Sequence, residues 1–180
     1  MKNISGSLNR LRSYILKNTK YKNYQIGEGF ICGEGISIWA KNKITIGKSF
    51  HMGKDSLIES DVIIGNDVTW EGRVALVEYY DHDYEQVGVP KRLQTKIRDK
   101  NFDWHEPVKL TSIANDVYIG FGTIITTGIS IGEGSIIYAG SLLLTDVEPF
   151  SIYAGIPAEK LDNRFQTTEE LNNYKKLTTR

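Results

Sequence analysis

An apolar residue returns at every sixth position over most of this sequence, and this period constrains the fold more than any other feature. In the second half of the chain it runs unbroken through Ile113, Ile119, Ile125, Ile131, Ile137 and Leu143. In the first half it runs from Ile46 to Leu76, after a two-residue slip that ends an earlier run begun at Ile26. An amphipathic helix would place apolar residues three or four positions apart, and a half-buried strand would place them at every second position. The repeat therefore belongs to neither.

Repeats of six residues predict an all-β solenoid, the parallel β-helix. Each hexapeptide forms one short strand and a turn, and three of them complete a triangular coil of about 18 residues. Coils stack about 4.8 Å apart, so that backbone groups pair with the coil above or below. The apolar residue points into the prism, which makes Cys32 a buried packing residue rather than a nucleophile. A β-sandwich would instead need hairpin turns every 8–12 residues or so.

The repeat divides the chain into three parts. Residues 26–161 form the β-helix domain. Residues 1–25 carry basic side chains and no acid, and LNRLRSYIL within them predicts a short amphipathic helix that caps the open end of the prism. Any contact of that segment with a membrane is expected to be peripheral. Residues 162–180 contain a capping box, Thr167 or Thr168 with Glu170, and predict a C-terminal helical tail.

Composition narrows the function classes. The formal net charge is zero, which argues against nucleic acid as a partner. A single cysteine excludes an intrachain disulfide and fits a reducing compartment. No segment has the apolar run of a signal peptide or the roughly 20 apolar residues of a membrane span. We therefore expect a cytoplasmic protein.

The six-residue rhythm breaks between Leu76 and Ile113, which predicts an excursion loop at about 77–112. This segment is rich in charge, holds two of the four prolines and has no rhythm of its own. Loops longer than about 15 residues in a compact domain are usually functional or disordered. Near its start lies His82, in the sequence YDHDYE. On composition alone, His82 would be taken for a solvated loop histidine.

The repeat pattern I-G-x-G-[ST]-x and the stretch VYIGFGTIITTGISIGEGSIIYAGSLLLTDVEPFSIYAGIPAEKL resemble the hexapeptide-repeat acyltransferases, in particular the sugar O-acetyltransferases. The resemblance covers residues 26–161. It implies a left-handed β-helix, acetyl-CoA as cosubstrate and transfer to a hydroxyl or amino group. It also implies a homotrimer with active sites in clefts between adjacent prisms. The hand of the helix comes from this resemblance, because the six-residue spacing does not decide it.

The resembling enzymes carry a catalytic histidine at the start of this loop, which His82 matches. A sugar hydroxyl needs a base to take its proton when it attacks a thioester, and histidine can accept that proton and return it to the leaving thiolate. The second ring nitrogen needs an acceptor that orients the imidazole. Asp81, Asp83, Glu85 and a backbone carbonyl all remain candidates for that acceptor.

Further positions carry over from the same resemblance. Tyr118 would line the cleft near the reacting centre. The backbone N–H of Phe121, which follows Gly120, would face the thioester carbonyl and stabilise the oxyanion as charge develops. Ala139 matches an alanine whose backbone contacts the pantetheine arm. The small residues next to it that a narrow tunnel requires are Gly140 and Ser141.

The phosphates of the coenzyme are expected near the end of the domain. SIYAGIPAEKL matches the family's closing G-x-P-A-[KR], except that Glu159 occupies the usual basic position. Lys160 and Arg164 are the remaining basic candidates. Thr145 would contribute a hydroxyl group.

For the acceptor, the loop offers Trp104, His105 and Arg92. His51 is expected to be structural or part of a cleft wall. A zinc site of the γ-class carbonic anhydrase type would need three histidines. That family places two of its ligands close in sequence, whereas His82 and His105 are 23 residues apart. We expect no metal.

The resemblance thus predicts an acetyl-CoA-dependent O-acetyltransferase that acts on a carbohydrate, with a role in the synthesis of capsule, lipopolysaccharide or another surface polysaccharide. Acetylation of the amino group of a sugar nucleotide would use the same coenzyme and base. A β-helix scaffold or binding module without activity is the alternative outside enzymes. The sequence does not decide between these acceptors.

Overall fold

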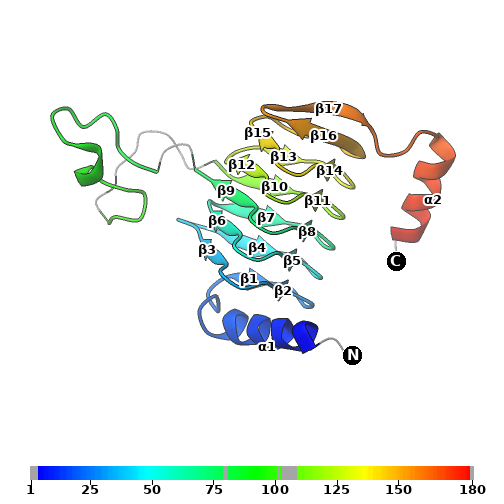
Figure 1. Cartoon of the computed structure of the whole chain (residues 1–180), viewed down its shortest axis with the longest axis horizontal. Coiled ribbons are helices and arrows are strands. Elements are labelled where there is room, and N and C mark those ends of the chain that lie inside the picture. The colour runs from blue at the N-terminus through cyan, green and yellow to red at the C-terminus, as the bar shows by residue number, and fades with distance from the viewer. Residues whose placement is uncertain (1–3, 79–80, 101, 103–108, 179–180) are drawn as a thin grey trace.

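The chain forms a triangular parallel β-solenoid of about six turns, seen in the computed structural model of Figure 1. The structure describes residues 4–78, 81–100, 102 and 109–178. Three sheets, here called faces A, B and C, form the sides of the prism. This confirms the predicted solenoid and the excursion loop, which leaves the prism between β9 and β10.

Successive strands step from face to face, and each pairs in parallel with the strand one coil away. Face A contains β1 (Gln25–Ile26), β4 (Ile44–Ile46), β7 (Val62–Ile64), β10 (Thr111–Ile113) and β13 (Ser130–Ile131). Face B contains β2 (Ile31–Cys32), β5 (His51–Met52), β8 (Thr69–Trp70), β11 (Tyr118–Ile119), β14 (Ile136–Ile137), β16 (Ser151–Gly155) and β17 (Ala158–Asn163). Face C contains β3 (Ser37–Trp39), β6 (Leu57–Glu59), β9 (Ala75–Val77), β12 (Ile124–Thr126) and β15 (Leu142–Leu143). Only β17 departs from the rule, because it runs antiparallel to β16.

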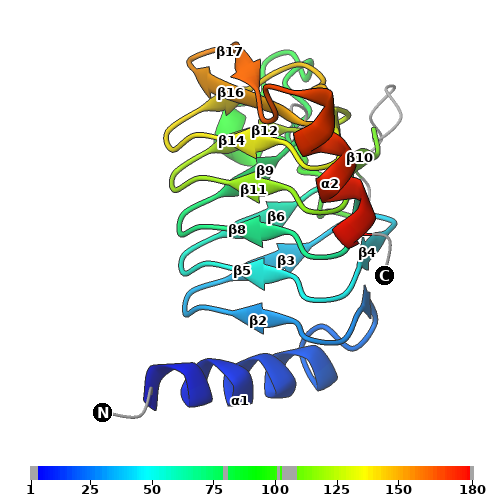
Figure 2. The same ribbon diagram turned by 90° about the vertical axis from the view of Figure 1, so that its right-hand side faces the viewer.

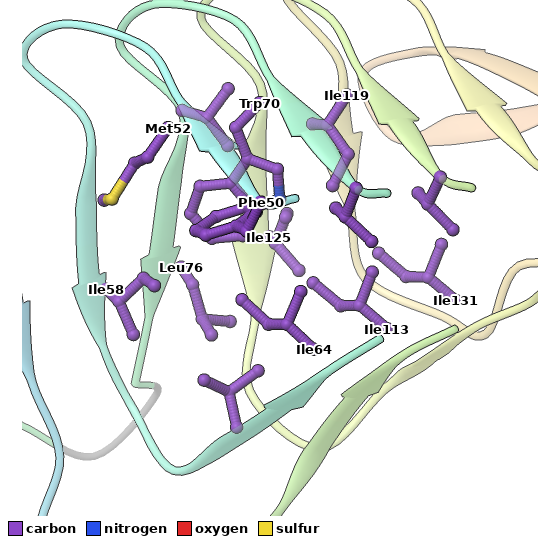
Figure 3. Packing of buried hydrophobic residues seen from close by; sticks show 14 of the residues in the cluster. Phe50, Met52, Ile58, Ile64, Trp70, Leu76, Ile113, Ile119, Ile125 and Ile131 are labelled. Atoms are coloured by element: carbon purple, nitrogen blue, oxygen red, sulfur yellow. The ribbon is translucent and has the colours of Figure 1, made fainter. Parts of the chain in front are cut away.

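The residues of the six-residue repeat fill the prism (Figure 3). Near the N-terminal end the ring of Phe50 stacks on Phe30 and meets the edge of Trp70, with ring centroids 6.0 Å and 5.6 Å apart. Further along, isoleucines from all three faces meet at the axis. Cys32 is fully buried as predicted, and burial raises the pKa of its thiol. Close stacking also explains the glycines: a Cβ on Gly120 would lie 2.5 Å from the backbone nitrogen of Ala139.

Both ends of the prism are covered. Helix α1 (Ile4–Asn18) lies across the N-terminal end, where Ser13 accepts a hydrogen bond from the backbone N–H of Cys32 and Lys17 donates one to Gly27 O. At the other end, the β16–β17 hairpin closes the last coil. Helix α2 (Thr168–Thr178) then runs back beside the coils (Figure 2), and the predicted capping box is present between Thr167 and Glu170. Neither described helix is long and apolar enough to cross a membrane.

Candidate active site

The loop starts above a column of polar side chains at the edge between faces C and A. Ser60, Glu78 and Thr127 come from three consecutive coils at this edge. Ser60 donates a hydrogen bond of 2.5 Å to the Glu78 carboxylate, and its hydroxyl lies 2.7 Å from that of Thr127. Burial raises the pKa of Glu78, and the Asp61 charge adds to this, whereas the hydrogen bonds from Ser60 and Thr127 act in the opposite direction. The six-residue apolar pattern did not reveal this cluster, although Ser60 and Glu78 are one coil of 18 residues apart.

His82 lies four residues beyond Glu78, where the loop folds on itself. Its Nδ1 is 2.9 Å from Oδ1 of Asp81, and its side chain is 33% exposed. The backbone holds it in a short two-stranded segment, in which His82 pairs with Lys96 and the N–H of Ile97 donates to Asp81 O. A carboxylate beside Nδ1 keeps the proton on that nitrogen and leaves Nε2 to accept one. Within the described part of the chain, no group bonds to Nε2.

The other two candidate orienting acids point elsewhere. The carboxylate of Asp83 accepts hydrogen bonds from the backbone N–H of Glu85 and from Nε2 of Gln86, and so it stabilises the turn that follows the histidine. Glu85 is exposed. Of the three acids, the geometry therefore favours Asp81.

The candidate oxyanion donor lies at a different edge, between faces B and C. Two turns meet there, one after β11 and one after β14, and the N–H of Gly140 donates to Phe121 O. The N–H of Gly120 donates a hydrogen bond to Ile137 O, next to the paired strands β11 and β14 of face B. Among the described residues, by contrast, the N–H groups of Phe121 and Ala139 donate to no carbonyl. Two adjacent donors of this kind can bind a carbonyl oxygen or an amide of a ligand.

Exposed apolar side chains surround these two N–H groups. Phe121, Ile124 and Tyr138 are all more than 40% exposed. Tyr118, on the outer surface of face B, is exposed as well, and its hydroxyl lies 3.4 Å from Oε1 of Glu71. Desolvation raises the pKa of Tyr118, and the Glu71 carboxylate raises it further. This edge therefore has the apolar surface that a coenzyme arm or a neighbouring subunit would cover.

Of the remaining residues predicted for the coenzyme, Gly140 and Ser141 lie at this edge and Thr145 does not. Gly140 is there, with a positive φ of 72° and open space where its Cβ would be. Ser141 is buried, and its hydroxyl donates to Tyr138 O, so it closes the turn. Thr145 is exposed, but at the edge between faces C and A. Thr145 thus lies apart from the two free N–H groups, whereas Ser141 belongs to the turn that holds Ala139.

The two basic candidates are engaged within the chain. Lys160 forms an ion pair with Glu148, with Nζ and Oε2 2.8 Å apart. Arg164 donates to Asp116 and to Gly134 O at the edge between faces A and B. Its guanidinium also lies over two aromatic rings, Phe165 and Tyr174. Arg164 therefore joins the C-terminal segment to the solenoid.

The acceptor candidates are only partly within the described chain. Arg92 is exposed, in the short 3-10 helix η1 (Lys91–Leu93) of the loop. Trp104 and His105 lie outside the described residues. His51 is exposed on face B, two strands from Tyr118 in the same ladder. In the described ranges, no three side chains of the types that bind metals come together.

The candidate groups are therefore distributed over separate edges of one prism. The loop with His82 projects away from the solenoid on the side of face C (Figure 1). Phe121 and Ala139, in the turns after β11 and β14, lie at the edge between faces B and C. A single chain thus presents His82 at one edge and a pair of N–H donors at another.

Comparison with known proteins gives three informative similarities. A chloramphenicol acetyltransferase of Klebsiella aerogenes is 47% identical over 62 residues, which are 34% of this chain and 29% of that protein. The galactoside O-acetyltransferase of Escherichia coli K12 is 30% identical over 118 residues, 64% of this chain and 52% of that protein. The structure of a maltose O-acetyltransferase from Clostridium difficile 630 is similar with a TM-score of 0.61 and 20% identity, covering 88% of this chain and 83% of that one.

The chain spans less than a third of the length of the chloramphenicol acetyltransferase and about half of the galactoside enzyme. No family model matches it. The maltose enzyme shares the solenoid, and the two curated proteins share sequence as well. In its parallel coils of six-residue repeats and in these stretches of sequence, the chain is similar to the hexapeptide-repeat β-helix acetyltransferases.

Proposed function

We propose that this protein is an acetyl-CoA-dependent O-acetyltransferase that transfers an acetyl group to a carbohydrate hydroxyl during synthesis of a surface polysaccharide. The observation that carries the proposal is the pair formed by His82 and Asp81 on the loop that interrupts the solenoid. A carbohydrate hydroxyl is the acceptor favoured by the similarity to galactoside O-acetyltransferase. The same similarity favours O-acetylation over N-acetylation.

In the proposed reaction, Nε2 of His82 takes the proton of the acceptor hydroxyl as its oxygen attacks the thioester carbonyl. Asp81, at Nδ1, stabilises the imidazolium that forms. The backbone N–H of Phe121 donates to the carbonyl oxygen as it becomes negative. The carbon–sulfur bond then breaks, and His82 returns its proton to the thiolate of coenzyme A.

Acetyl-CoA would lie along the edge between faces B and C. The free N–H of Ala139 suits an amide carbonyl of the pantetheine arm, and the exposed side chain of Tyr138 next to it offers apolar contact. We assign the phosphates to none of the residues predicted for them, because Lys160 and Arg164 are paired with Glu148 and Asp116.

The proposed active enzyme is a homotrimer. His82 and the N–H groups of Phe121 and Ala139 lie at different edges of the prism, so a complete site combines the loop of one copy with the edge of its neighbour. The exposed apolar side chains at the edge between faces B and C support such a contact.

The first test measures release of free coenzyme A from acetyl-CoA with a panel of acceptors. The panel contains neutral oligosaccharides, amino-sugar nucleotides and chloramphenicol. We expect turnover with oligosaccharides, and an acetyl group that hydroxylamine removes from the product, as it removes esters but not amides. Turnover only with amino-sugar nucleotides would replace the proposal by N-acetylation, and absence of both binding and turnover would favour a scaffold.

The histidine is tested separately. We expect His82→Ala to lower kcat by about 10²–10⁴-fold without changing the Kd of acetyl-CoA, because it removes only the base. Asp81→Asn should lower kcat by about tenfold, since the exposed carboxylate orients the ring without carrying out the proton transfer. Asp67→Asn makes the same chemical change at an exposed turn on another edge and serves as the control. Undiminished transfer by a folded His82→Ala variant would contradict the assignment.

A further inference from the structure

Helix α1 leaves most of its described apolar side chains exposed. Toward the solenoid it turns Ser13, which is buried, and Leu16, which packs against the core. Leu8, Leu11 and Ile15 occupy the opposite side and are 56%, 58% and 49% exposed. At 100° per residue these three positions fall within one narrow stripe. A capping helix that needed only the prism for stability would place this stripe inward.

Basic residues flank the stripe on both sides. Arg12 lies between the stripe and the solenoid on one side, and Arg10 lies on the other side, as their spacing along the helix requires. Lys17 is on the side of Arg10, but its ammonium donates to Gly27 O of the first coil. Six basic residues and no acid occur in the first 22 positions: Lys2, Arg10, Arg12, Lys17, Lys20 and Lys22. The rest of the chain holds the other 16 basic residues and all 22 acidic ones, a formal charge of −6. The neutral protein is therefore strongly polarised, with its positive charge in this segment.

The position of α1 makes the stripe accessible to a large flat partner. The helix lies across the end of the solenoid, roughly perpendicular to the direction in which the coils stack (Figures 1 and 2). In both views, the other labelled elements lie on the solenoid side of α1, and none of them lies over the side of the helix that faces away from the coils.

We propose that α1 binds the end of the molecule to an anionic lipid bilayer, with Leu8, Leu11 and Ile15 inserted among the headgroups and the basic side chains on lipid phosphates. An amphipathic helix with an apolar row between basic flanks is the form that lies in a membrane interface. Each basic residue near an anionic surface adds attraction. The solenoid axis then stands upright on the membrane. This inference is independent of the proposed reaction.

The charge also decides between a bilayer and a second copy of the chain. Pairing two α1 stripes end to end would bring two segments of charge +6 together, and like charges at such short range repel. Nucleic acid would attract the charge but would leave the apolar stripe in water. An anionic bilayer satisfies both.

The test is sedimentation of the full chain with vesicles of neutral phosphatidylcholine or of phosphatidylcholine with about 30 mol % phosphatidylglycerol. We expect binding to the anionic vesicles at least about tenfold tighter than to the neutral ones, weakening as NaCl rises from about 0.1 M to about 0.5 M. Leu11→Asp/Ile15→Asp should lower the affinity for anionic vesicles by more than about tenfold, because two inserted side chains are lost. Arg10→Gln/Arg12→Gln should reduce the preference for anionic lipid.

The matched control is Ile156→Asp/Leu161→Asp, which removes two exposed apolar side chains and adds two negative charges at the other end of the solenoid. It should bind as the wild type does. Thermal unfolding of each variant verifies that α1 still caps the prism. The proposal is overturned if the wild type binds no anionic vesicle, or if the control loses as much affinity as the α1 variant. It is also overturned if the α1 variant instead dissociates an assembly seen by light scattering, which would make the stripe a protein contact.

Discussion

At the scale of single residues, the narrow prism accepts polar side chains where a nearby backbone carbonyl satisfies them. The small residues at the corners show this most clearly. Thr123, Ser135 and Ser141 each donate a hydrogen bond to the carbonyl oxygen three residues earlier. Their hydroxyls therefore close the turn, and their small side chains fit its limited volume.

The hydrogen bonds to the Glu78 carboxylate offset the cost of its burial only in part. The stability of the protein should therefore depend on pH through this residue. Because burial raises the pKa of Glu78 above its ordinary value of 4.5, the folded state favours the protonated carboxyl. The contribution of the protonated Glu78 carboxyl to folding stability is complete below the pKa of the unfolded state. It is lost as the pH rises through the pKa of the folded state. We expect Glu78→Gln to be more stable than the wild type near pH 8, by less than about 1 kcal/mol given partial screening by solvent.

The measurement is urea unfolding of both proteins at about pH 8 and at about pH 4.5. The advantage of the variant should shrink at the lower pH, where the wild-type carboxyl gains its proton. An advantage that grows toward acid pH would show that the charged form of Glu78 is the stabilised one.

At the scale of elements, the strands repeat and the terminal segments do not. Every strand of the solenoid other than β17 pairs in parallel with a strand one coil away, so its environment follows from the local period. The C-terminal segment is held differently. Phe150 packs with Phe165 and Tyr174 between the last coil and α2, and Arg164 lies against this aromatic cluster while bonding to Asp116. Burial raises the pKa of the Tyr174 phenol.

The structure predicts that Arg164 stabilises α2 and does not bind coenzyme. Arg164→Met removes the ion pair and the contact of the guanidinium with the rings, at a cost of about 1–2 kcal/mol to docking of the helix. Backbone amides of α2 should exchange with deuterium faster in the variant, while amides of the coils do not change. The Kd of acetyl-CoA should remain that of the wild type. A large loss of acetyl-CoA affinity with unchanged exchange would return Arg164 to the coenzyme site.

At the scale of the whole molecule, the groups of the proposed site are separated within each chain. This leads to a prediction for mixed assemblies. Inactive His82→Ala and inactive Ala139→Trp chains, unfolded and refolded together in equal amounts, should recover about one quarter of wild-type activity, because one contact in four joins an intact loop to an intact edge. Light scattering should give the mass of a trimer.

Each variant refolded alone is the control and should stay inactive. Recovery of no activity by trimers of verified mixed composition would mean that one chain supplies both groups. A stable, fully active monomer would contradict the oligomeric proposal altogether.

The sequence alone determined the solenoid, its inward-facing residues, the place of the loop and both terminal helices. It could do so because each coil contacts mainly the coils next to it, so a local period specifies the stacking. Tertiary structure decided which acid meets His82, since Asp81 and Asp83 are equivalent in sequence but differ in the turn that the loop adopts. It also decided that Arg164 meets Asp116, 48 positions earlier, and that α1 leaves Leu8, Leu11 and Ile15 exposed while Ser13 is buried against the prism. Contacts of this kind depend on the path of the chain through space, and a six-residue pattern contains no information about that path.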